Sequence, residues 1–130
     1  MAGLNRIQLI GRLGGDPEAR ITPNDKQVVT FRLAVDRRWR GAEGQANTAT
    51  DWFNVEAWGR LGEICQAYLS KGRLVFVEGR LQTDRYEKDG EPWQFTKVVA
   101  LQMQMLDRRT VDDNGSADEI EESEPLAVEA

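Results

Sequence analysis

Residues 51–58 read DWFNVEAW, and residues 59–72 continue as GRLGEICQAYLSKG. Two kinds of side chain alternate along residues 51–58, which is the period of a β-strand with one buried face. One set points into a core: Phe53, Val55 and Ala57. The other set is forced onto the opposite, polar face: Trp52, Asn54, Glu56 and Trp58. The segment therefore predicts a strand that carries two tryptophans on its wet face.

Residues 60–71 follow a helical period instead of a strand period. An apolar residue recurs at positions i, i+3, i+4 and i+7, and these residues are Leu61, Ile64, Cys65 and Tyr68. Gly72 stands where the C-terminus of a helix favours a left-handed residue. We therefore expect one amphipathic helix after the strand, with these four side chains in the core and an inert Cys65.

Two further strands are predicted before this unit. Residues 5–13 alternate, with Ile10 as the exception, and residues 29–35 alternate between apolar positions and Thr30, Arg32 and Ala34. Residues 14–17, GGDP, turn the chain between them. Residues 37–50 are polar, contain glycine and show no period, so we expect a long mobile loop there and a third strand from about Asp51.

Two strands are predicted after the helix. Residues 74–86 form the fourth, with Gly79 as a bulge or coiling point, residues 88–92 form a turn, and residues 93–106 form the fifth. Five strands with one helix between strands 3 and 4 follow the order of an OB barrel. We predict an all-β protein, a five-stranded OB-fold barrel occupying residues 1–109.

Charge is divided unevenly along the chain, although its net value is −5. Residues 1–109 hold all 17 Lys and Arg and 14 of the 22 acids, a balance of +3, whereas residues 110–130 hold the other 8 acids and no base. The second segment has no aromatic residue and too little apolar surface to offset chain entropy. We predict a disordered acidic tail over residues 110–130, attached to a weakly basic domain.

The composition excludes several kinds of chemistry. The chain has no His and a single Cys, Cys65, which excludes His-centred catalysis, His–Cys zinc sites and an intramolecular disulfide. Its first residues resemble neither a secretory signal nor a transit peptide, and no segment is apolar enough to span a membrane. We expect a cytoplasmic protein with no catalytic residues, metal or cofactor.

Aromatic and basic residues are interleaved at two more places. Trp39 lies within Arg37-Arg38-Trp39-Arg40, and Tyr86 lies within Arg85-Tyr86-Glu87-Lys88. Exposed rings call for a partner, and unpaired bases offer a π-face for each ring and a phosphate for each neighbouring cation. The pattern predicts binding to a single-stranded nucleic acid. Trp93 is interpreted differently, as a core residue or a subunit contact.

Eight segments in the same order resemble the bacterial single-stranded DNA-binding proteins. They are residues 5–14 (NRIQLIGRLG), 16–18 (DPE), 39–40 (WR), 52–55 (WFNV), 59–61 (GRL), 68–72 (YLSKG), 77–81 (VEGRL) and 103–106 (MQML). The resemblance implies an OB fold and a homotetramer in the cytoplasm, associated with the nucleoid. It also implies sequence-independent binding and protection of single-stranded DNA in replication, recombination and repair.

The family's functional positions fall on rings and cations of this chain. The stacking positions correspond to Trp39, Trp52, Trp58 and Tyr86. Positions near the strand path correspond to Arg6, Arg40, Arg60, Lys71, Arg73 and Arg85, while Asp84 stands where some relatives are basic. Together with the two basic clusters, the predicted phosphate contacts are Arg6, Arg37, Arg38, Arg40, Arg60, Lys71, Arg73, Arg85 and Lys88.

The tail departs from the family pattern. Family members end in an acidic run followed by Ile-Pro-Phe, whose aromatic tip docks onto replication and repair proteins, whereas this chain ends EPLAVEA. It also has no Gly- or Gln-rich linker. We therefore expect its tail to recruit replication and repair partners less than the tails of typical relatives.

Two other functions are compatible with parts of the sequence. A metal-dependent nuclease would draw on Asp51, Glu56 or Asp84, but each is explained as a strand or turn charge and there is no phosphate-binding loop. An OB domain that serves RNA or protein partners could use the same rings, because stacking is indifferent to the 2′-hydroxyl. Binding to matched DNA and RNA oligomers distinguishes the RNA-binding hypothesis from the single-stranded DNA-binding hypothesis.

Overall fold

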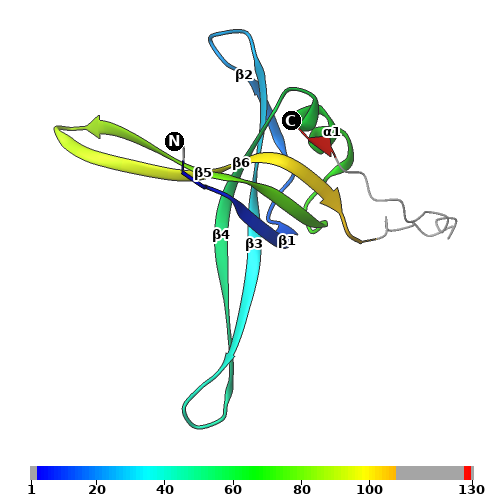
Figure 1. Ribbon diagram of the computed structural model, residues 1–130, viewed down its shortest axis with the longest axis vertical. Coiled ribbons are helices and arrows are strands. Elements are labelled where there is room, and N and C mark those ends of the chain that lie inside the picture. Colours follow the sequence, from blue (N-terminus) through cyan, green and yellow to red (C-terminus); the bar gives the residue numbers. More distant parts are fainter. Residues whose placement is uncertain (1–2, 108–127, 130) are drawn as a thin grey trace, which may run out of the picture.

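The computed structural model describes residues 3–107 and 128–129. Its elements in chain order are β1 (Ile7–Leu13), β2 (Glu18–Ile21), β3 (Gln27–Arg40), β4 (Ala46–Trp58), α1 (Gly59–Tyr68), β5 (Leu74–Lys88), β6 (Glu91–Met105) and β7 (Val128–Glu129). Figure 1 shows a central barrel from which long hairpins project in different directions. The barrel positions these projections.

Five strands close the barrel, in the order β1-β5-β6-β4-β3. The circle is completed where β1 pairs with β3, with Arg12 opposite Ala34 and Leu13 opposite Leu33. β4 and β6 pair in parallel, and β2 adds to the outer edge of β3. The helix α1 lies between the third and fourth barrel strands, β4 and β5. The predicted all-β OB-fold barrel is therefore confirmed.

The core follows from the alternation of each barrel strand. The inward residues of β3 and β4 are buried, among them Val29, Leu33 and Val55. Gly11 lies where β1 crosses β3, and a Cβ there would collide with the carbonyl of Ala34. Glycine is therefore needed for the close approach that closes the barrel. Ile10 is exposed, as its break from the alternation predicts.

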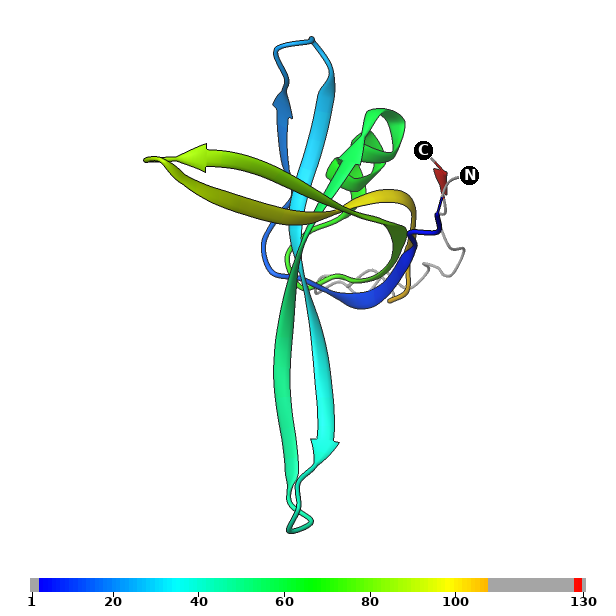
Figure 2. The ribbon, with the colours of Figure 1, turned by 60° about the vertical axis from the view of Figure 1, so that its left-hand side comes forward.

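The predicted mobile loop at residues 37–50 is wrong. β3 and β4 stay paired along their whole lengths, as far as Arg40 opposite Ala46, and form a long hairpin that leaves the barrel (Figures 1 and 2). Most side chains of this arm face solvent on both sides, so its sequence shows no apolar period although its backbone ladder is complete. We call residues 36–50 the β3–β4 arm.

A second hairpin is formed by β5 and β6. Its turn is Asp89-Gly90, with φ of 55° and 78°, the left-handed pair that a two-residue hairpin turn requires. A bulge lies at the level of Gly79, but its additional residue is on the partner strand β6: Glu78 pairs with Gln102 and Gly79 with Ala100, which leaves Leu101 unpaired in this ladder. We call residues 80–97 the β5–β6 arm. Figure 2 shows it projecting from the barrel separately from the β3–β4 arm.

The helix differs from its prediction at its C-terminal end. α1 ends at Tyr68 and the chain is extended at Leu69, so Gly72, with φ of 88°, lies in a following turn instead of capping the helix. Leu61, Ile64 and Cys65 are buried as expected, and burial raises the pKa of the Cys65 thiol to about 12. Tyr68 is exposed, so its placement in the core was wrong. The buried Leu69, one residue later, fills the core instead.

Most of the predicted acidic tail lies outside the described residues. Val128 and Glu129, near its end, form β7, which pairs antiparallel with Met103 and Gln102 of β6. Disorder of residues 110–127 stays a prediction. Within the described part of the chain, no helix has the length and apolarity to cross a membrane.

Candidate nucleic-acid interface

The outer face of β3 and β4 carries the tryptophans that the alternation placed there. The ladder sets Trp52 opposite Ala34, Asn54 opposite Arg32, Glu56 opposite Thr30 and Trp58 opposite Val28. β2 extends the same rows, with Glu18 opposite Thr30 and Arg20 opposite Val28. Paired residues of an antiparallel ladder share a face. Three strands thus present one continuous surface of rings, cations and polar groups.

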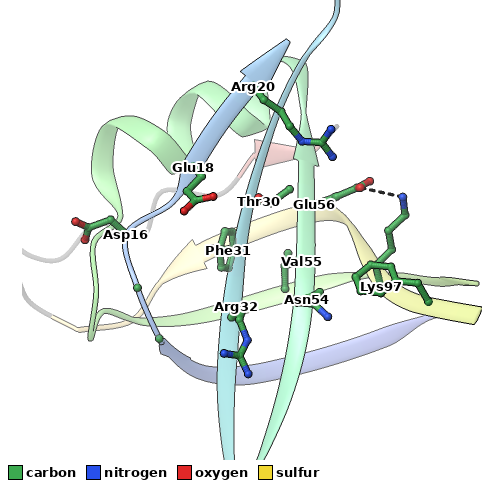
Figure 3. Close-up of a pocket in the computed structure, with 13 residues that line it drawn as sticks. Asp16, Glu18, Arg20, Thr30, Phe31, Arg32, Asn54, Val55, Glu56 and Lys97 are labelled. Atoms are coloured by element: carbon green, nitrogen blue, oxygen red, sulfur yellow. Dashed lines mark hydrogen bonds and ion pairs between the residues drawn. The ribbon is translucent and has the colours of Figure 1, made fainter. Parts of the chain in front are cut away.

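This surface is hollowed at its centre. The hollow has a volume of about 410 Å³ and is bounded by β2, β3, β4 and the base of the β5–β6 arm. Figure 3 shows the guanidinium groups of Arg20 and Arg32 and the ammonium of Lys97 around it. Asn54 and Phe95 also contribute to the wall. The carboxylates of Asp16, Glu18 and Glu56 line it as well. The hollow therefore offers guanidinium groups, an amide and an aromatic ring, which are groups that contact nucleic-acid strands, beside these acids.

Trp52 stands beside the hollow with 48% of its side chain exposed. The guanidinium carbon of Arg32 lies 4.3 Å from the ring centroid, close enough for a cation–π contact. On another side, the six-membered ring lies so close to Gly14 that a Cβ there would collide with it. Arg32 and Gly14 therefore hold an exposed indole in one orientation, which reduces the ordering cost of stacking a base on it.

Trp58 is partly buried, in contrast to Trp52. Its indole N–H donates a hydrogen bond of 3.1 Å to Oε1 of Glu56, whose other oxygen accepts one of 2.8 Å from Lys97. Lys97 also lies 3.0 Å from Oδ2 of Asp84. Glu56 is only 7% exposed, so the alternation placed it on the correct face, where its neighbours cover it. This network fixes the ring of Trp58 and the base of the β5–β6 arm.

The same network shifts two pKa values. Burial opposes the charge on Lys97, but its hydrogen bonds and ion pairs with Glu56 and Asp84 outweigh burial and raise the Lys97 pKa above 10.5. The pKa of Asp84 is lowered below 3.8 by a hydrogen bond from Gln82 and then by Lys97. Lys97 is therefore a cation, and Asp84 an anion, throughout the neutral range.

Trp39 lies on the β3–β4 arm with 46% of its side chain exposed. Arg37 is 5.2 Å from its ring centroid and forms an ion pair of 2.7 Å with Asp51. By alternation, Trp39 and Arg37 share one face of the arm, whereas Arg38 and Arg40 lie on the other face, which is that of Trp52. The sequence cluster at residues 37–40 is thus split between two surfaces.

Tyr86 lies near the tip of the β5–β6 arm and is 48% exposed. Its cross-strand partner is Trp93, which is also 48% exposed, so the core interpretation of Trp93 was wrong. The reason is that β6 begins on the projecting arm and joins the barrel core only from about Val98, so side chains before that point find no core. The other interpretation, a subunit contact, stays untested. Lys88 shares the face of Tyr86, whereas Arg85 faces the opposite side.

The remaining predicted cations are scattered. Arg6 pairs with Glu78 at 3.2 Å, and Arg60 lies exposed on α1. Lys71 is exposed, and its backbone N–H donates to Asp16. Arg73 is mostly buried and pairs with Asp107 at 2.8 Å. The structure brings none of these four side chains into the wall of the hollow.

Four residues of the hollow were missed: Arg20, Arg32, Phe95 and Lys97. Arg32 had a usable signal, because the alternation of residues 29–35 already placed it outward beside the strand that carries Trp52. Arg20 and Lys97 had none, since β2 is too short to show a period and Lys97 depends on which strand β6 joins. Sequence reasoning groups neighbours in the chain, whereas the hollow is assembled from four strands.

A closed five-stranded barrel with a helix after its third strand defines an OB-fold domain, and this one carries rings and cations on its outer face. Residues 4–106 match the model of the Single-strand binding protein family. The chain belongs to that family.

Individual relatives agree with the assignment. The chain is 44% identical over 106 residues to Single-stranded DNA-binding protein 1 of Chlorobaculum tepidum, and 41% identical over 114 residues to Single-stranded DNA-binding protein of Neisseria meningitidis serogroup A. These matches cover 80% and 87% of this chain but only 65% and 66% of the relatives. The solved Plasmodium falciparum SSB complex with ssDNA is 33% identical with a TM-score of 0.70, over 76% of this chain and 88% of that one.

Proposed function

We propose that this protein binds and protects single-stranded DNA without sequence preference, in replication, recombination and repair, and that it does so without catalysis. The observation that carries the proposal is Trp52, an indole held by Arg32 and left half exposed beside a hollow whose wall includes Arg20 and Arg32. Such a ring is prepared to stack on an unpaired base. Relatives named as single-stranded DNA-binding proteins are 44% and 41% identical to this chain over 106 and 114 residues.

Stacking and charge supply the affinity in different ways. Stacking of a base on an aromatic ring contributes about 1–3 kcal/mol and tolerates any base. The guanidinium groups of Arg20 and Arg32 line the hollow and can meet phosphates that join the stacked bases, whereas the ammonium of Lys97 is paired with Glu56 and Asp84. Duplex DNA has its ring faces occupied by stacking, so it meets the same cations but not the rings. The surface therefore favours single strands over duplex.

The three acids that a nuclease would draw on have structural partners. Asp51 pairs with Arg37, whereas Glu56 and Asp84 share the ammonium of Lys97. Glu56 also accepts the indole hydrogen bond of Trp58. These carboxylates form ion pairs, and one of them holds a ring in place. Metal-ion catalysis is not needed to explain them. This supports a binding role instead of an enzymatic one.

We further propose that the protein acts as a homotetramer in the cytoplasm, associated with the nucleoid. Support comes from the resemblance of eight sequence segments to bacterial single-stranded DNA-binding proteins and from membership in the family.

Fluorescence anisotropy with labelled dT, rU and duplex oligomers of equal length tests the proposal, with sedimentation of each mixture to report the number of subunits. We expect tight binding to dT, weaker binding to rU and far weaker binding to duplex. Preference for rU over dT would support the RNA-binding alternative. Equal affinity for duplex and dT would contradict the proposal that unpaired bases stack on the rings.

A further inference from the structure

The β5–β6 arm carries three exposed rings, those of Tyr86, Trp93 and Phe95. The ladder sets Tyr86 opposite Trp93 and Asp84 opposite Phe95. Directly opposed residues share a face, and so do alternate residues along each strand. Tyr86, Trp93 and Phe95 therefore lie together on one face of the arm, which we call the ring face.

The other face of the arm is mostly polar. It carries Thr83, Arg85, Gln94 and Thr96, with Leu81 at its base and Pro92 near its tip. The hydroxyls of Thr83 and Thr96 lie 3.2 Å apart across the strands. All three rings thus lie on one face of the arm. Both faces are outside the barrel, so packing of the core does not explain this arrangement. Trp93 and Phe95 are 48% and 43% exposed, and such an apolar strip on a projecting hairpin calls for a partner.

The ring face is continuous with the hollow. Phe95 and Lys97 belong to the ring-face side of β6 and also line the hollow beside Arg32 and Asn54. The hydrogen bond of 2.8 Å from Lys97 to Glu56, drawn in Figure 3, fixes the base of the arm against β4. A strand that crosses the hollow therefore meets Phe95 first and then the cross-strand pair of Tyr86 and Trp93.

Charge contributes little along the arm itself. Its four cationic and four acidic side chains balance: Arg80, Arg85, Lys88 and Lys97 against Asp84, Glu87, Asp89 and Glu91. The arm therefore offers ring faces without a net field for phosphates. A contact of this kind adds affinity that does not depend on salt, in contrast to the cations of the hollow.

We propose that Trp93 and Phe95, together with Tyr86, form a second stacking platform for unpaired bases, along which the strand continues when it leaves the hollow. The proposal rests on the proposed function, because it extends the same binding surface. Its occupant is the same single strand, since the platform begins in the wall of the hollow. A second copy of this chain on the ring face is the competing outcome.

Binding of labelled dT oligomers of increasing length tests the platform. Trp93→Ala and Phe95→Ala are each expected to weaken binding of the longer oligomers about 5- to 150-fold, the equivalent of one lost base stack. The factor should be equal at low and high salt. Trp93→Phe keeps a ring and should restore most of the affinity. Gln94→Ala, on the opposite face of the same strand, is the matched control and should bind as the unmodified protein does.

Cross-linking gives a direct readout of contact. Trypsin cleavage after Lys88 and Lys97 releases residues 89–97, which contain Trp93 and Phe95 but not Tyr86. Irradiation of the full chain with a 5-iodo-deoxyuridine oligomer should attach nucleotide to this peptide. Attachment should be lost in the Trp93→Ala, Phe95→Ala double variant and kept in Gln94→Ala.

The outcomes separate the platform from the proposed function. If the unmodified protein binds dT, Trp52→Ala weakens it, and the Trp93 and Phe95 variants bind like Gln94→Ala, the platform is refuted while the proposed function stands. If these variants sediment as smaller species with unchanged affinity per subunit, the ring face is an interface between copies and the platform is refuted. If the unmodified protein does not bind dT, both fail.

Discussion

The ammonium of Lys97 on β6 lies 2.8 Å from Oε2 of Glu56 on β4, and Oε1 of the same carboxylate accepts the indole N–H of Trp58. One buried carboxylate thus joins the base of the β5–β6 arm to a ring of the outer face. Its side chain and that of Lys97 are 9% and 13% exposed. The relative position of the two surfaces that we assign to DNA depends on this contact.

Lys97→Met should therefore destabilise the domain by about 2–4 kcal/mol, between the cost of a lost charged hydrogen bond and that of an uncompensated buried charge. The folded-state pKa of Lys97 is raised, so its contribution is fully present below pH 10.5 and is lost as the pH rises through the raised value. Urea unfolding at a series of pH values measures the difference. Lys26→Met, at an exposed turn, is the control. A constant difference that persists to the highest pH would contradict this account.

Asp84 makes the stability of the fold depend on pH in the acid range. Its pKa is lowered by Gln82 and then by Lys97, so the stabilisation it provides is present above pH 3.8 and is lost as the pH falls through the lowered value. Asp84→Asn should abolish this part of the acid sensitivity. An unchanged acid transition in that variant would show that Asp84 does not contribute.

Trp52→Ala should weaken binding to single-stranded DNA by about 1–3 kcal/mol and leave the fold intact, because the ring is half exposed and lies outside the core. Anisotropy with dT oligomers measures the first effect and thermal unfolding the second. Trp52→Phe should retain most of the affinity. If Trp52→Ala unfolds, the ring is a core residue and the outward placement fails.

Affinity for poly-dT should fall steeply with salt, with a slope of about −0.7 in log–log form for each phosphate neutralised. Arg38→Gln should reduce that slope, since Arg38 is exposed and has no ion pair with any residue that the structure describes. Arg73→Gln should lower the thermal stability and leave the slope unchanged, because its guanidinium is mostly buried against Asp107. A slope that responds to Arg73→Gln and not to Arg38→Gln would reverse these roles.

Removal of residues 110–130 should tighten binding to single-stranded DNA at low salt and have little effect at high salt. The segment holds 8 acids and no base, and tethering keeps its effective concentration at about millimolar near the basic surface. Salt screens this competition by shortening the Debye length. Weaker binding of the truncated chain at low salt, or its dissociation into monomers, would show that the segment is structural.

Much of the barrel could be predicted from the sequence, because each barrel strand buries one face and so leaves a period-two signal. Phe53 and Val55 show this signal, and Leu61 and Ile64 show the helical one. The β3–β4 arm could not be predicted, since a hairpin exposed on both faces has no apolar period. Trp93 was misplaced for a related reason: its alternation is correct, but this part of β6 lies on the arm, outside the core.

The candidate site was predicted in part. Trp52 could be placed because its own strand defines its face. Arg20 and Lys97 could not be placed, since their position beside Asn54 depends on pairings between strands far apart in the sequence. Ion pairs such as that of Arg73 with Asp107 likewise cannot be predicted without the fold. The sequence therefore does not distinguish a basic residue that pairs with an acid from one that is available to DNA.

The most direct test of the central claim is the emission of the intrinsic tryptophans during titration with a dT oligomer, at a salt concentration where binding is stoichiometric. All four indoles lie outside the buried core, and Trp39, Trp52 and Trp93 are close to half exposed. If bases stack on these rings, the account predicts that single-stranded DNA quenches most of the emission and that duplex of equal length does not. Tight binding of dT with unchanged emission would contradict it.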